Sequence, residues 1–102
     1  MSDMTVVQEI FRQLGGTMFS VITGAKNFLG SSDTLTMSLP RGAKGNRLSI
    51  KLEANDTYTV TLFSVRAMNV KVLKKSEMVY CDNLLDVFED MTGLYATLGR
   101  RN

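Results

Sequence analysis

TLTMSL at residues 34–39, LSIKL at 48–52 and TYTVTL at 57–62 are the segments that decide the fold. In each of them apolar and polar residues alternate, which predicts strands with one buried face and one face in water. Half-buried strands are typical of antiparallel sheets, because parallel sheets are covered on both faces. The segment NVKV at 69–72 repeats the alternation more briefly, and the apolar segment 18–22 fits either a strand or a helical turn.

The connections between these segments are short. Residues 54–56 and 67–69 have the composition of tight turns, and residues 40–46 form a looser loop with two glycines. No connection is long enough for a crossover helix, which parallel neighbours would need. We therefore expect about five antiparallel strands in a single sheet.

Amphipathic helices are predicted at both ends of the chain, over residues 4–14 and 81–92. The first has an apolar stripe at helical spacing and ends at Gly15. The second places its apolar residues on one side and its aspartates on the other, and it ends at Gly93. The predicted fold is α+β: a single domain, residues 1–102, whose two terminal helices pack on one face of the sheet. The two stripes are Val7, Ile10, Phe11 and Leu14, and Cys81, Leu84, Leu85, Phe88 and Met91.

The core follows from these faces. Met37, Met68, Met78 and Met91 are expected to be adaptable core filler rather than a recognition surface, and Cys81 is expected to be a small core residue. The predicted core contains Phe11, Leu14, Phe19, Leu35, Met37, Leu48, Ile50, Leu52, Tyr58, Val60, Leu62, Leu85 and Phe88.

Composition argues against an enzyme. The 102 residues include no His and one Cys, so the commonest general base and metal ligand is missing and no internal disulfide can form. We therefore expect no catalytic residues, no metal and no cofactor. No apolar stretch approaches the ~20 residues that cross a bilayer, and no signal peptide is recognised. A cytoplasmic protein without a membrane partner is the simplest expectation.

Charge is unevenly distributed, although the formal net charge is only +2. Residues 41–75 contain eight bases and two acids, whereas residues 77–90 contain five acids and no base. Such asymmetry can orient a charged partner, or it can reflect two solvated elements of opposite bias.

Two basic, glycine-containing segments are candidate anion sites. RGAKGNR at 41–47 has three bases and can follow a phosphate backbone, although a mobile surface loop has the same composition and no aromatic residue is interleaved for base stacking. TGAKN at 23–27 can hold an anion with its amides and Lys26, or it is a plain turn. The candidate nucleic-acid contacts are Lys26, Arg41, Lys44, Arg47 and Lys51.

The water-facing side of the sheet is a candidate protein interface, because it has many small hydroxyls and one aromatic residue, Phe63. An exposed aromatic commonly anchors an interface; the alternative is that the C-terminal tail covers it. Asp82, Asp86 and Asp90, spaced i, i+4, could imitate a phosphate backbone or form a solvated face. The full set of water-facing residues is Thr34, Thr36, Ser38, Ser49, Lys51, Thr57, Thr59, Thr61 and Phe63.

Several short motifs together resemble a family of small uncharacterised proteins of phages and other mobile elements. They are EIFRQLGG (9–16), Phe19, TGAKN (23–27), DTY (56–58), Arg66, Tyr80 and TGLY (92–95). The resemblance covers residues 9–95 and departs from the family pattern at Thr17–Met18, where a more polar pair is expected. It implies an accessory protein made in an infected or lysogenic bacterium, and it brings no catalytic residues.

These observations lead to three hypotheses. The first is a non-catalytic accessory protein that binds a host protein or nucleoprotein complex, with counter-defence as one such role. The second is a nucleic-acid-binding module that uses the basic loop and the sheet face. The third is a self-associating structural or virion component, a homo-oligomer joined through sheet edges or through the Thr-rich face of the sheet.

Overall fold

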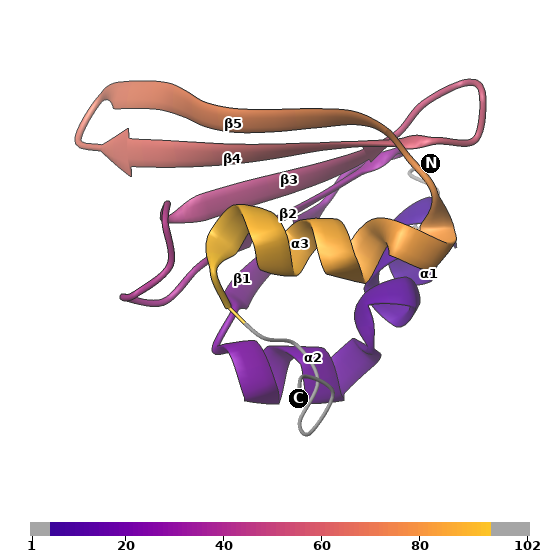
Figure 1. The fold of residues 1–102 in the computed structure, drawn as a ribbon, viewed down its shortest axis with the longest axis horizontal. Coiled ribbons are helices and arrows are strands. Elements are labelled where there is room, and N and C mark those ends of the chain that lie inside the picture. The colour runs from indigo at the N-terminus through magenta and orange to yellow at the C-terminus, as the bar shows by residue number, and fades with distance from the viewer. Residues whose placement is uncertain (1–4, 95–102) are drawn as a thin grey trace.

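The centre of the fold is an antiparallel sheet, drawn as a ribbon in Figure 1 from a computed structural model that describes residues 5–94. Within these residues the sheet has five strands, and their spatial order is the order of the sequence. This arrangement confirms the predicted α+β class and the single antiparallel sheet. The strands are β1 (Lys26–Gly30), β2 (Thr34–Ser38), β3 (Arg47–Leu52), β4 (Tyr58–Arg66) and β5 (Asn69–Val79).

The register of the central strands places the apolar residues on one face. Met37 pairs with Leu48, and Leu48 pairs in turn with Leu62. Ile50 lies between Leu35 and Val60 in the next buried row. All of these side chains are buried, so the alternation read from the sequence gives the correct buried face.

Three α-helices cover the buried face of the sheet (Figure 1). They are α1 (Thr5–Leu14), α2 (Gly16–Thr23) and α3 (Leu84–Thr92), and a short 3₁₀ turn, η1 (Cys81–Asn83), precedes α3. A row of aromatic rings joins these elements. Phe28 of β1 lies 5.1 Å from Phe11 and 6.5 Å from Phe19, and Phe19 lies 4.8 Å from Phe88, measured between ring centroids. These contacts bind the three helices to the edge of the sheet.

Residues 18–22, which fitted either a strand or a helical turn, are helical and lie within α2. Its Thr23 hydroxyl donates a hydrogen bond to the Phe19 carbonyl (2.8 Å), and Gly24 N–H donates to the Ser20 carbonyl (2.9 Å), which ends the helix. The fifth strand is instead β1, which covers Lys26 and Asn27 of the segment expected to be an anion loop or a turn. β1 is defined by its pairing with β2, and it shows no clear alternation of its own, so the sequence does not reveal this strand.

Strand β5 is much longer than the predicted segment 69–72. Its pairing with β4 is interrupted twice, between Tyr58 and Val60 and between Leu62 and Phe63. At each interruption β5 contains one residue more than β4, which is the signature of a β-bulge. Met78, in one of the bulges, has a positive φ of 58°. These extra residues break the period-two pattern, so the sequence shows only the first part of the strand.

Most of the predicted core is buried, with Phe11, Leu52 and Leu85 only partly so. Three expectations are wrong. Cys81 is exposed, because α3 begins at Leu84 and the preceding 3₁₀ turn rotates Cys81 off the apolar stripe. Met68 and Met78 are exposed, because one lies in a hairpin turn and the other in a bulge of an edge strand.

Thr57 is a further correction, since it was expected to face water and is only 3% exposed. Its hydroxyl donates a hydrogen bond to the Asn55 side-chain oxygen (2.7 Å) inside the β3–β4 turn. This local bond satisfies the hydroxyl and allows it to be buried.

Candidate partner-binding groove

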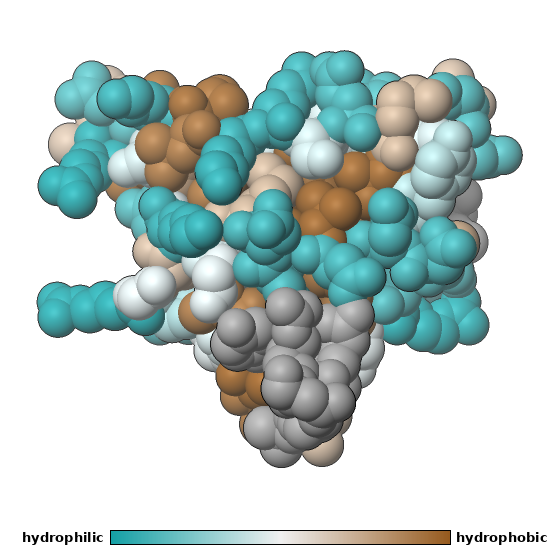
Figure 2. Space-filling model, in the orientation of Figure 1, coloured by the Kyte–Doolittle hydropathy of each residue, from teal (hydrophilic) through white to brown (hydrophobic). Residues whose placement is uncertain are grey.

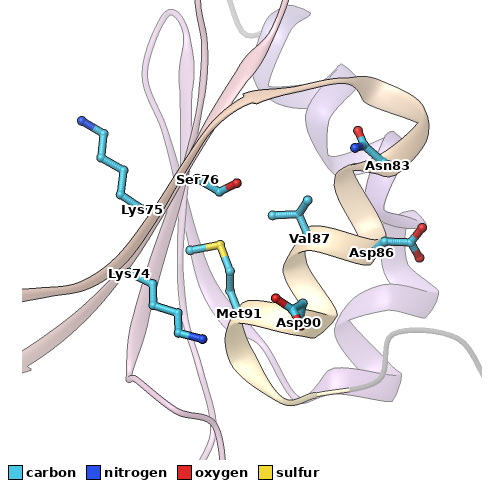
Figure 3. Close-up of a pocket in the computed structure, with 8 residues that line it drawn as sticks. All are labelled: Lys74, Lys75, Ser76, Asn83, Asp86, Val87, Asp90 and Met91. Atoms are coloured by element: carbon cyan, nitrogen blue, oxygen red, sulfur yellow. The ribbon is translucent and has the colours of Figure 1, made fainter.

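A groove lies between β5 and α3, with a volume of about 610 Å³ (Figure 3). Ser76 of β5 points across it toward Val87 of α3, and the Met91 side chain extends between the two elements. Figure 2 shows apolar surface at the floor of this groove between hydrophilic rims. The lining residues are Lys74, Lys75, Ser76, Asn83, Asp86, Val87, Asp90 and Met91.

The two walls of the groove carry opposite charge. Lys74 extends from β5 into the gap, whereas Lys75 points away from it (Figure 3), consistent with its pairing to Glu77 (3.3 Å). Asp86 and Asp90 lie one helical turn apart on the α3 wall. A ligand in the groove would therefore meet Lys74 on the strand side, Asp90 on the helix side and apolar atoms below, whereas the Asp86 carboxylate points away from β5 (Figure 3).

The free edge of β5 borders this groove. β5 pairs with β4 on one side only, within the described chain, and runs for 11 residues. Backbone N–H and C=O groups on such an edge can pair with another extended chain. Lys71, Lys74 and Lys75 are all exposed along this strand, and lysines are a common means of preventing pairing between identical edges.

The end of the β4–β5 hairpin carries exposed apolar residues. Phe63 pairs with Val72 and Val65 pairs with Val70. Val70 and Val72 are 65% and 55% exposed, and Met68 in the turn is 97% exposed. Apolar surface gathers over this end of β5 in Figure 2. The predicted anchor Phe63 is thus half-buried, and it belongs to a patch that the sequence did not reveal.

Apart from Thr57, the predicted sheet-face residues share one face of the sheet. Lys26, Ser38, Arg47 and Phe63 form one cross-strand row, and Lys51 pairs with Thr34 on one side and Thr59 on the other. Thr61 pairs with Ser49 and Lys75. The Thr59 hydroxyl donates to the Glu53 carboxylate (2.7 Å), so it is already engaged.

The remaining predicted residues lie elsewhere. Arg41 and Lys44 are in the loop between β2 and β3, where Arg66 from the end of β4 joins them. Asp82 is exposed in η1, whereas Asp86 and Asp90 line the groove. Of the acidic row, the structure therefore places two members at the candidate site.

Sequence reasoning missed the contribution of β5 to the groove and, on α3, that of Val87. Ser76 and Val87 have no distinctive local pattern, because their importance depends on the packing of the helix against the strand. A usable signal was present in Lys71, Lys74 and Lys75, since a cluster of lysines in a strand is typical of a sheet edge.

Residues 5–94 contain no cluster of metal-ligating side chains. His, Cys, Asp and Glu side chains do not gather there in groups of three that could hold a metal ion. Burial, followed by the nearby Cys81, Glu9 and Asp56, raises the pKa of Tyr58, which keeps its phenol protonated at neutral pH. In the same residues no helix is long and apolar enough to span a membrane.

The chain matches no family model, no curated protein and no solved structure.

Proposed function

We propose that this protein is a non-catalytic binding protein that holds an extended segment of a partner protein in the groove between β5 and α3. The observation that carries the proposal is the free edge of β5 beside a groove with an apolar floor. Addition of a strand to an exposed edge supplies affinity through the backbone, and the adjacent groove supplies specificity through alternate side chains.

The groove favours a segment of particular chemistry. An apolar side chain would contact Val87 and Met91, and its burial contributes roughly 25 cal/mol per Å² of apolar surface removed from water. An acidic side chain next to the strand would face Lys74, and a basic one on the helix side would face Asp90. We expect a partner strand that alternates apolar and charged residues.

A heterologous partner fits the edge better than a second copy of this chain. Lysines line β5, and pairing two such strands brings like charges together, which is destabilising. From the resemblance of its motifs to phage and mobile-element proteins we propose that the partner is a protein of the bacterial host, such as a component of a defence complex. Self-association is accordingly the weaker of these two hypotheses.

Selection of displayed peptides on the folded protein tests this function. Bound peptides are expected to shift amide resonances along β5 and α3. Ser76→Arg, which fills the groove, is expected to lower the affinity for these peptides at least about tenfold. Val87→Glu should act similarly by charging the floor. The matched control is Val21→Glu, because Val21 is exposed on α2, outside the groove lining.

Two outcomes contradict the proposal. One is a set of peptides whose resonance shifts map away from β5 and α3. The other is an equal loss of affinity with Val21→Glu, which would indicate non-specific apolar binding. Circular dichroism of each variant establishes that it is folded before its affinity is compared.

A further inference from the structure

The loop between β2 and β3 is held in place by backbone hydrogen bonds to distant segments. Leu39 N–H donates to the Asn46 carbonyl and Asn46 N–H donates to the Phe63 carbonyl, both at 3.0 Å. Lys44 N–H donates to the Thr92 carbonyl (2.9 Å) at the end of α3. These contacts fix both the base and the middle of the loop.

The Asn46 side chain adds a second attachment to β4. Its amide donates to the Val65 carbonyl (2.8 Å), and its oxygen accepts from Val65 N–H (2.8 Å). The side chain therefore acts as one more paired residue beyond the end of β3. Gly45 allows this close approach, because a Cβ there would lie 2.6 Å from the Phe63 carbonyl oxygen.

This fixed loop forms one wall of a pocket of about 240 Å³, and the end of β4 forms the other. Three cations line the pocket: Arg41 and Lys44 from the loop and Arg66 from β4. The remaining lining residues are Leu39, Pro40, Ala43, Gly45, Asn46 and Ser64, so the lining contains no carboxylate.

The three cations are not neutralised by acidic residues in the described part of the chain. Within the described range, 5–94, ion pairs join Arg12 to Glu9 and Lys75 to Glu77. None of these pairs involves Arg41, Lys44 or Arg66. Grouping three like charges is unfavourable unless an anion is present, since each cation repels the others. Two arginines from separate segments also present planar sets of donors suited to an oxyanion.

We propose that this pocket binds a phosphate group. Arg41 and Arg66 would donate charge-assisted hydrogen bonds to its oxygens, Lys44 would supply a third positive charge, and the Ser64 hydroxyl would complete the donor set. The site is separate from the β5–α3 groove and does not depend on the function proposed for that groove.

Two sources could supply the phosphate: a small phosphorylated molecule or the backbone of a single-stranded nucleic acid. Arg47 directly follows Asn46, and it pairs with Phe63 on the open face of the sheet. A nucleic-acid strand leaving the pocket would therefore meet a further cation and an aromatic ring, which is the usual combination for single-strand binding.

The test is a titration of the ¹⁵N-labelled protein with inorganic phosphate at constant ionic strength, followed by amide chemical shifts. Saturable shifts are expected for the loop and the end of β4. Arg66→Gln is expected to weaken binding about tenfold, as loss of one charge-assisted hydrogen bond implies. Lys51→Gln, an equal charge change on the open face, should leave the affinity within about twofold.

The same measurement with a short oligothymidylate separates the two sources. Tighter binding than phosphate, weakened by Arg66→Gln, assigns the site to a nucleic-acid strand. Equal binding per phosphate assigns it to a small phosphorylated ligand. The proposal is overturned by linear shifts without saturation, or by Lys51→Gln weakening phosphate as much as Arg66→Gln does.

Discussion

Substituting Gly45 with alanine tests whether close approach of the β2–β3 loop to β4 holds this end of the molecule together. A Cβ at this position would lie 2.6 Å from the Phe63 carbonyl oxygen and 2.9 Å from two side-chain carbons of Leu62. Non-bonded carbon atoms prefer separations of about 3.5–4.0 Å, so the loop or the strand must move. Neither moves freely, because Asn46 binds β4 through its backbone and its side chain.

The expected cost follows from these contacts. Overpacking of this kind costs about 1–3 kcal/mol, and stretching the Asn46 N–H bond to the Phe63 carbonyl removes a contribution of about 0.5–1.5 kcal/mol. Alanine restricts the unfolded chain more than glycine, which returns about 0.4–1 kcal/mol. We expect a net loss of about 2–3 kcal/mol in the free energy of unfolding, corresponding to a fall in Tm of about 10–20 °C.

Urea denaturation monitored by circular dichroism measures this loss, and Gly42→Ala in the same loop is the control. A Cβ at Gly42 meets nothing within 4 Å, so its cost is limited to the backbone strain of a positive φ, 98°, about 1–2 kcal/mol. A loss at Gly45 no greater than the loss at Gly42 would refute the steric argument. Unchanged amide shifts at Phe63 and Val65 would refute the proposed coupling to β4.

Ala67→Gly should stabilise the protein by about 0.5–1 kcal/mol in urea denaturation, because Ala67 has a φ of 52° in the β4–β5 turn and glycine adopts it without strain; a loss of stability would show that the methyl group is needed. Cys81→Ser should change stability by less than about 0.5 kcal/mol because Cys81 is exposed, and the folded protein's thiol should react readily with a disulfide reagent; protection until unfolding would contradict the exposed position. Burial raises the pKa of Tyr58 above its ordinary value of 10.0, so above pH 10 the folded state keeps a proton that the unfolded state loses. The contribution of Tyr58 to the free energy of unfolding is therefore fully present below pH 10 and should decrease as the pH rises above 10. Tyr58→Phe should flatten this fall in pH-dependent denaturation, and an identical slope would argue against a raised pKa.

The basic and acidic segments of the sequence acquire separate roles in the fold. Arg41 and Lys44 gather with Arg66 at one pocket, while Asp86 and Asp90 form a wall of the groove. Arg47 and Lys51, close to them in sequence, face the open side of the sheet instead. Spatial grouping rather than net charge thus defines the two candidate sites.

The sequence by itself determined the antiparallel sheet, its buried face and the two terminal helices. The alternation in residues 34–62 is local information, because each side chain selects core or water by its own polarity. The pairing of β2 with β3 and of β3 with β4 then brings the apolar residues of all three strands to the same face.

Tertiary structure alone decided the rest. β1 and most of β5 are strands because a neighbouring strand offers hydrogen bonds, and their own side chains do not alternate clearly enough to show it. The groove depends on how α3 packs beside β5, and the pocket lined by Arg41, Lys44 and Arg66 depends on the contact of a loop with a strand end about 20 residues away. Such contacts join residues distant in the chain, so no local pattern contains them.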